Sequence, residues 1–102
     1  MAGTKHDMDV DVIEKISMAV PSKWNVVLYN DDRTSIDVVL LILMKVFSMD
    51  PQAAFAKMME IHEGEKGIVG TFSKEVADTK RDESISIARS NGYPLRVEVE
   101  RS

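Results

Sequence analysis

The 102-residue chain contains no cysteine, only three prolines and five glycines, and few aromatic residues (6%). The absence of cysteine excludes disulfides, thiolate metal sites and a cysteine nucleophile. Acidic residues outnumber basic ones by 17 to 13, so the net charge is −4 and the basic surface that nucleic-acid binding needs is missing. No apolar run reaches the roughly 18 residues of a membrane span, so we expect no membrane partner.

The first 21 residues differ in composition from the rest of the chain. They carry four acidic residues and two lysines, without the basic start and apolar run of a signal peptide. We therefore expect residues 1–21 to be a flexible N-terminal extension, residues 22–102 to form a single domain, and the protein to be cytoplasmic.

Hydrophobic periodicity predicts six elements in the order β-α-α-β-α-β. Alternating β-forming residues predict strands at 23–29, 67–72 and 95–100, and the two glycines of the second indicate a bulge or a close backbone approach. So short a chain cannot bury three strands on both faces. We therefore expect an α+β fold in which a three-stranded antiparallel sheet packs against three helices.

The three predicted helices each follow a capping residue. Thr34, with Asp37 in a capping box, is expected to begin a helix at about 35–48 that is apolar nearly all round and therefore enclosed. Asp50 and Pro51 begin the second helix, which buries Phe55 and ends near Gly64. The third predicted helix runs from Ser73 to Asn91-Gly92, with Val76 facing inward and Lys80 facing water.

The sequence Asn30-Asp31-Asp32 lies between the first strand and the first helix. Asn and Asp are ordinary turn residues, so a purely structural role accounts for their presence there. If His62 lies close by, however, an amide oxygen, a carboxylate and an imidazole nitrogen converge as hydrogen-bond acceptors. A protonated α-amino group offers three donors in a small volume and suits such a site.

An apolar pocket beside this turn could hold the side chain attached to such an amine. Its candidate residues are Ile36, Val39, Met58, Ile61 and Leu95, with the flexible Met58 making the pocket adaptable. Ordinary core packing explains the same residues equally well.

Catalytic and cofactor motifs are missing from the sequence. Ser73 and Thr71 lie in no nucleophile motif, and Asp31, Asp32, His62 and Glu63 match no metal-binding spacing. The glycines near residue 67 lack the Lys-Ser/Thr of a phosphate loop. We therefore expect neither an enzyme nor a bound cofactor or metal.

Taken in order, these motifs resemble the ClpS family, adaptors that hand N-degron proteins to a Clp AAA+ unfoldase for proteolysis. The resemblance covers about residues 22–101. The matching stretches are Trp24 to Asp32 with Thr34, Met58 to His62, Gly67 to Ser73, Glu75 to Ala77 with Thr79 and Lys80, and Pro94 with Leu95.

The resemblance implies roles that spacing alone does not give. It assigns the substrate α-amino group to Asn30, Asp31, Asp32 and His62. It surrounds the first side chain, usually Leu, Phe, Tyr or Trp, with Thr34, Ile36, Val39, Met58, Ile61 and Leu95. It places Glu75 and Lys80 on the face that docks the N-terminal domain of a ClpA- or ClpC-type unfoldase, and implies that the acidic extension acts during delivery.

The sequence departs from the usual family pattern at three positions. Arg33 and Ser35 replace the common aromatic residue and proline, and Ile36 stands where a methionine usually guards the pocket. Isoleucine is β-branched and stiffer than methionine, so it bears on which first side chains are accepted. We expect amine recognition to survive, with a preference for large unbranched or aromatic first residues.

Two other functions are compatible with the same pattern of elements. A partner-binding module that resembles the C-terminal domain of the large-subunit ribosomal stalk protein would use an exposed basic helix and no N-terminal residue recognition. A hydrolase would use Asp32 and His62. Replacing His62 with alanine distinguishes the three functions. It should abolish peptide binding by an adaptor, have little effect on a stalk-like module, and abolish turnover by a hydrolase.

Overall fold

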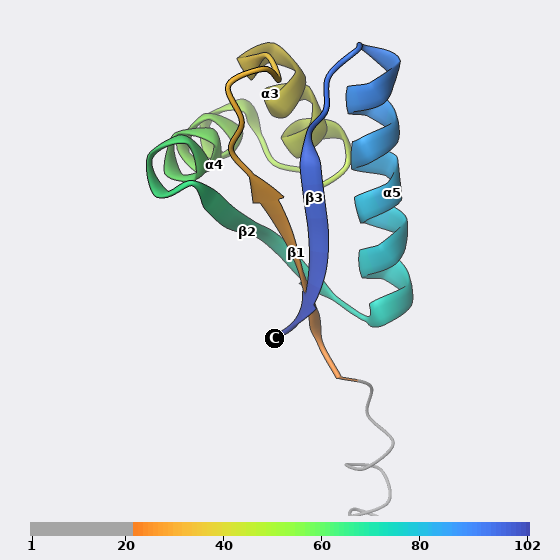
Figure 1. Ribbon diagram of the computed structural model, residues 1–102. Helices are drawn as coiled ribbons and strands as arrows, with labels where there is room; N and C mark the ends of the chain where they lie inside the picture. The colour runs from red at the N-terminus through yellow and green to blue at the C-terminus, as the bar shows by residue number, and fades with distance from the viewer. Residues whose placement is uncertain (1–21) are drawn as a thin grey trace, which may run out of the picture.

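The computed structural model describes residues 22–102, so the predicted extension at 1–21 lies outside the described residues. The six elements follow the predicted β-α-α-β-α-β order (Figure 1). They are β1 (Trp24–Tyr29), α3 (Ile36–Lys45), α4 (Pro51–Gly64), β2 (Lys66–Phe72), α5 (Lys74–Ser90) and β3 (Arg96–Arg101).

The strands form one antiparallel sheet in the order β2-β1-β3, which confirms the predicted fold class. β1 is the central strand and pairs along its whole length with both neighbours. Its register with β2 shifts between Val26 and Val27, where Val69 is the extra residue opposite. The predicted bulge therefore lies between Gly67 and Gly70.

The core lies between the sheet and the helices. Val26 and Leu28 of β1 are fully buried and pack with Ile42 and Leu43 of α3. Ala77 and Ala88 let α5 approach closely, and both are fully buried. Figure 1 shows α5 running alongside the sheet, while α3 and α4 lie beyond the end of β1 where the next loop begins.

The ends of α3 differ from the prediction. Ser35, and not Thr34, caps the helix by accepting a hydrogen bond from the Val38 N–H at 3.2 Å. The predicted capping box is therefore wrong, because the Thr34 hydroxyl is bonded to Asp31 instead. The helix ends at Lys45, three residues early, since the chain turns through a left-handed Ser48 (φ 57°) before α4.

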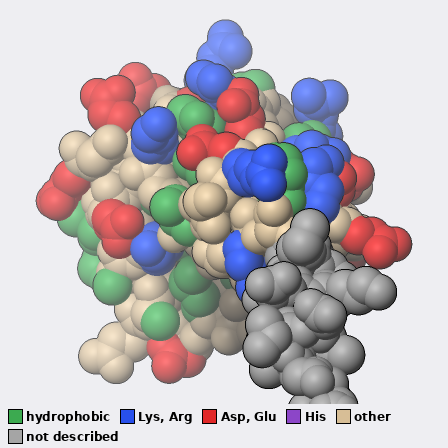
Figure 2. All heavy atoms as spheres, turned by 90° about the horizontal axis from the view of Figure 1, so that it is seen from below, with side chains coloured by type: hydrophobic (Ala, Val, Ile, Leu, Met, Phe, Trp, Pro, Cys, Tyr) green, Lys and Arg blue, Asp and Glu red, His purple; other side chains and the backbone are tan. Residues whose placement is uncertain are grey.

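The exposure of several apolar side chains also differs from the prediction. α3 is not enclosed, because Ile36, Leu41 and Met44 all reach solvent. Phe55 of α4 and Val76 of α5 were predicted to be buried and are exposed. On the face shown in Figure 2, hydrophobic side chains likewise reach the surface among charged ones.

The capping predictions for the other two helices were largely right. Asp50 caps α4 by accepting from the Ala53 N–H at 2.8 Å, and Ser73 caps α5. At the end of α4 the left-handed residue is Glu65 (φ 73°), whereas Gly64 completes the helix.

Candidate functional site

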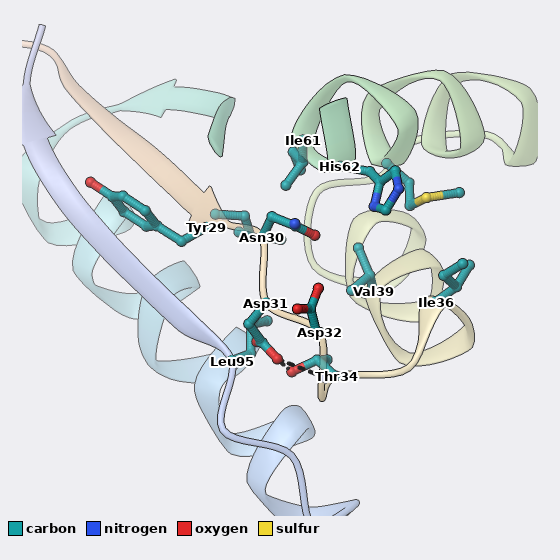
Figure 3. Close-up of a pocket in the computed structure, with 12 residues that line it drawn as sticks. Tyr29, Asn30, Asp31, Asp32, Thr34, Ile36, Val39, Ile61, His62 and Leu95 are labelled. Atoms are coloured by element: carbon teal, nitrogen blue, oxygen red, sulfur yellow. Dashed lines mark hydrogen bonds between the residues drawn. The ribbon is translucent and has the colours of Figure 1, made fainter. Parts of the chain in front are cut away.

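A cavity of about 190 Å³ opens where β1, α3 and α4 meet (Figure 3). Every residue predicted for the amine site and its pocket lines this cavity. A cavity of roughly 150 Å³ is large enough to bind benzene, so this one accommodates a single large side chain. Its lining consists of Leu28, Tyr29, Asn30, Asp31, Asp32, Thr34, Ile36, Val39, Met58, Ile61, His62 and Leu95.

A backbone hydrogen bond brings the ends of β1 and α4 together. The Asn30 N–H donates to the Glu65 carbonyl at 2.9 Å, immediately after the strand ends. Because Glu65 directly follows α4, this bond holds Asn30 beside the last helical turn, which carries His62. The sequence could not show that these residues meet, and the structure confirms that they do.

Asn30, Asp32 and His62 surround the mouth of the cavity. Figure 3 shows the Asp32 carboxylate and the Asn30 amide directed into the space that His62 borders from α4. Within residues 22–102, none of these three side chains makes a hydrogen bond or ion pair. The mouth therefore presents an amide oxygen, a carboxylate and an imidazole as free acceptors for a small cationic donor.

Asp31 lines the cavity, but its carboxylate turns toward Thr34 (Figure 3). Its Oδ1 accepts the N–H groups of Arg33 (2.7 Å) and Thr34 (2.8 Å), and its Oδ2 accepts the Thr34 hydroxyl (2.8 Å). Burial raises the pKa of Asp31, but these hydrogen bonds and the nearby Arg33 charge outweigh it and hold the pKa below its ordinary value. The arrangement fixes the loop between Asn30 and α3.

The interior of the cavity is apolar. Met58, Ile61 and Leu95 are each at most 5% exposed, and Val39 contributes from α3. The backbone of Gly67 packs so closely on Ile61 that a Cβ there would lie 2.8 Å from Ile61 Cγ1. This glycine is therefore required by the close approach of β2 to α4, and Ile61 is held in place against the cavity.

Ile36 occupies the rim of the cavity and is 55% exposed. It is the first residue of α3, so its position follows from the Ser35 cap and the Asp31 loop before it. Being β-branched, it has restricted χ1 freedom and forms a stiff edge to the opening.

Glu75 and Lys80 lie together on α5, away from the cavity, in a shallow groove lined by Glu75, Val76, Thr79, Lys80 and Glu83. The prediction that Lys80 faces water is wrong, because its ammonium group is bonded within the fold. Its Nζ donates to the Val46 carbonyl at 2.9 Å and lies 5.5 Å from the Phe72 ring centroid. It therefore satisfies a carbonyl at the end of α3 and ties that helix to α5.

Sequence reasoning missed two cavity residues and one structural contact. Leu28 and Tyr29 line the cavity, and their place directly before Asn30 is the signal that could have identified them. The Asn30–Glu65 hydrogen bond had no sequence signal, because it joins positions 35 residues apart in the chain.

Across residues 22–102, His, Asp and Glu side chains form no cluster suited to a metal ion. In the same part of the chain, no helix is both long and apolar enough to cross a membrane.

Comparison with known proteins gives a consistent result. Residues 19–98 match the family described as ATP-dependent Clp protease adaptor protein ClpS. The ClpS adapter of Vibrio cholerae serotype O1 is 43% identical over 96 residues, covering 92% of this chain and 91% of that protein. The ClpS adapter of Desulfotalea psychrophila is 35% identical over 101 residues, covering 99% of each.

A solved structure is similar as well. Agrobacterium tumefaciens ClpS2 bound to L-phenylalaninamide superposes with a TM-score of 0.79 at 29% identity. The match covers 81% of this chain and all of that one.

Proposed function

The chain belongs to the ClpS family of ATP-dependent Clp protease adaptors, and from this premise we propose that it selects proteins by their first residue. It is an adaptor and not an enzyme, with an AAA+ unfoldase and a protein substrate as partners. The proposed ligand is an N-degron, meaning a free α-amino group followed by Leu, Phe, Tyr or Trp. The proposed recipient is a ClpA- or ClpC-type unfoldase.

The observation that carries this proposal is an apolar cavity with acceptors at its mouth that make no hydrogen bond or ion pair within residues 22–102. A protein α-amino group has a pKa of roughly 8 and is largely protonated at neutral pH. Asp32 supplies the opposite charge, while the Asn30 amide and the His62 imidazole supply further acceptors. The first side chain then enters the cavity, where its burial is favourable.

The relative with a known ligand supports the same chemistry. Agrobacterium tumefaciens ClpS2 was solved with L-phenylalaninamide, a molecule with a free α-amino group next to a benzyl side chain. A cavity of about 190 Å³ in this chain has room for such a ring.

Ile36 sets the proposed preference among first residues. A β-branched first residue of the substrate, such as Val, carries its extra methyl group on the carbon next to its own backbone. This methyl group would lie against the stiff Ile36 edge, and the short side chain would fill the cavity poorly. We predict that a peptide starting with Phe binds at least about tenfold more tightly than one starting with Val. Replacing Ile36 with alanine should narrow this difference.

Fluorescence anisotropy with labelled peptides that differ only at the first residue (Phe, Leu, Met or Val) measures this preference. Equal affinity for Val and Phe peptides would refute it. Leu41→Ala is the matched control, because Leu41 is another exposed apolar residue of α3 that does not line the cavity.

The groove on α5 is the proposed docking face for the unfoldase N-terminal domain. An exposed apolar residue, Val76, lies among Glu75, Thr79 and Glu83, which is the usual pattern of an apolar centre with a polar rim. Lys80 contributes through the part of its side chain that its bond to Val46 leaves accessible.

We predict that Glu75→Arg weakens binding to the N-terminal domain of a ClpA- or ClpC-type unfoldase about tenfold, since reversing a rim charge opposes a complementary surface. Peptide affinity should not change, because Glu75 lies outside the cavity. Titration of that domain can be followed by Trp24 fluorescence, because the Trp24 ring of β1 lies beside the start of α5, with its centroid 5.3 Å from the Lys74 Nζ. Glu100→Arg is the control; an equal loss there would argue against this docking face.

A further inference from the structure

Phe55 is a large aromatic side chain that α4 leaves 55% exposed. It does not line the cavity, and its exposure forgoes the burial that an aromatic residue normally gains. Ile36, at the cavity rim, is exposed to the same extent. An exposed aromatic residue on a helix that also lines the binding cavity suggests a contact that forms only when the ligand is present.

The periodicity of α4 places Phe55 on the same side of the helix as His62. The two are seven residues apart, which is nearly two complete turns and roughly 10 Å along the axis. Met58 and Met59 lie between them in the sequence; Met58 lines the cavity and Met59 is partly buried against the core. Phe55, Met59 and His62 therefore follow one another along one side of α4, starting at the cavity mouth.

A substrate held by its α-amino group at His62 would reach this surface a few residues later. An extended chain advances about 3.3 Å per residue, and its side chains alternate between two sides. The third side chain therefore points to the same side as the first and lies roughly 7 Å further on. The second side chain points away from the adaptor.

A second route away from the mouth is less favourable. A polar groove lined by Tyr29, Asn30, Asp31, Gly64, Glu65, Lys66, Pro94 and Arg96 adjoins the cavity. The cationic side chains of this groove already make contacts. Arg96 Cζ lies 4.0 Å and Lys66 Nζ 5.6 Å from the Tyr29 ring centroid. Arg96 Nε also donates a hydrogen bond to Glu98 Oε2 at 2.7 Å. A substrate chain entering this groove would compete with those contacts, whereas Phe55 offers uncovered apolar surface.

We propose that Phe55 forms a second subsite, which selects substrates with a large apolar or aromatic third residue. The proposal rests on the proposed function, because it needs the first residue to be held in the cavity. It narrows the substrate class from proteins with a suitable first residue to those with a suitable first and third residue.

The test compares three ligands by isothermal titration: L-phenylalaninamide, and two peptides that begin Phe-Ser-Phe and Phe-Ser-Ser and are otherwise identical. We expect the wild-type protein to bind the Phe-Ser-Phe peptide about fivefold more tightly than the Phe-Ser-Ser peptide, the scale of one partly exposed aromatic contact. Phe55→Ala should remove that difference and leave L-phenylalaninamide binding unchanged. Its exposure makes Phe55 a safe site to truncate, and Leu41→Ala is the matched control that should keep the fivefold difference.

Three results would overturn the subsite. In the first, the wild-type protein binds both peptides equally. In the second, Phe55→Ala retains the difference in affinity between the two peptides. If the double variant Lys66→Glu/Arg96→Glu then loses that difference, the third residue binds in the polar groove. In the third, neither peptide nor L-phenylalaninamide binds the wild-type protein, which overturns the proposed function as well; binding of L-phenylalaninamide without a third-residue effect overturns the subsite alone.

Discussion

Asp32→Ala should weaken binding of a peptide with a free N-terminal Phe by about 10- to 100-fold. A hydrogen bond to a charged group contributes about 1.5–3 kcal/mol, and Asp32 is the carboxylate at the mouth whose oxygens remain free within residues 22–102. The variant removes the only charge of opposite sign that the Asn30, Asp32 and His62 side chains offer the ammonium group, together with the hydrogen bond to it.

Asp82→Ala is the control for the change in net charge, since Asp82 is an exposed carboxylate on α5 away from the cavity. Fluorescence anisotropy at fixed ionic strength should show that it leaves affinity nearly unchanged. Thermal unfolding should confirm that Asp32→Ala is folded, because Asp32 makes no hydrogen bond within residues 22–102. A loss of less than threefold would mean that Asp32 does not bind the amine.

Asp31→Ala should act mainly on stability, with a loss of about 2 kcal/mol in the free energy of unfolding. The variant removes the acceptor for two N–H groups and the Thr34 hydroxyl, and each such bond contributes about 0.5–1.5 kcal/mol. Asp31→Asn is the matched variant, because it can keep an oxygen for the N–H groups while losing the charge. Urea unfolding should rank wild type above Asp31→Asn, and Asp31→Asn above Asp31→Ala.

The pH dependence of this stabilisation has a definite sign. The folded pKa of Asp31 lies below its reference value of 3.8, so the carboxylate stabilises the fold at pH values above 3.8. That contribution is lost as the pH falls through the folded pKa. The stability advantage of wild type over Asp31→Asn should therefore be constant at neutral pH and disappear in acid; an advantage that grew in acid would contradict the assignment.

The sequence predicted the fold well because its strands and helices carry strong local signals. Alternation in residues 24–29 and the Asp50-Pro51 start of α4 depend only on nearby residues, and both were confirmed. The meeting of Asn30 with His62 was not predictable from spacing, since it depends on the Asn30–Glu65 hydrogen bond across 35 residues. Only the family resemblance brought these positions together, and family membership now removes the reason for a stalk-like or hydrolase interpretation.

The wrong predictions have physical causes. Thr34 and Ser35 are both suitable caps, and the choice between them is decided by Asp31, which binds the Thr34 hydroxyl and leaves Ser35 to cap α3. Lys80 looked like a solvent-exposed charge until the fold placed the Val46 carbonyl beside it. Phe55 was expected in the core, since hydrophobicity alone does not distinguish a buried residue from an exposed one.

The central claim is that the adaptor recognises the charged α-amino group of its substrate together with the first side chain. The most direct test measures the affinity of two peptides that are identical except that one begins with free Phe and the other with N-acetylated Phe. Acetylation removes the charge and two donors but leaves the benzyl group intact. We predict binding of the free peptide and a loss of at least about 100-fold on acetylation, the scale of two or more charge-assisted hydrogen bonds. Equal binding of the two peptides would contradict the account, because the cavity would then recognise the side chain without the amine.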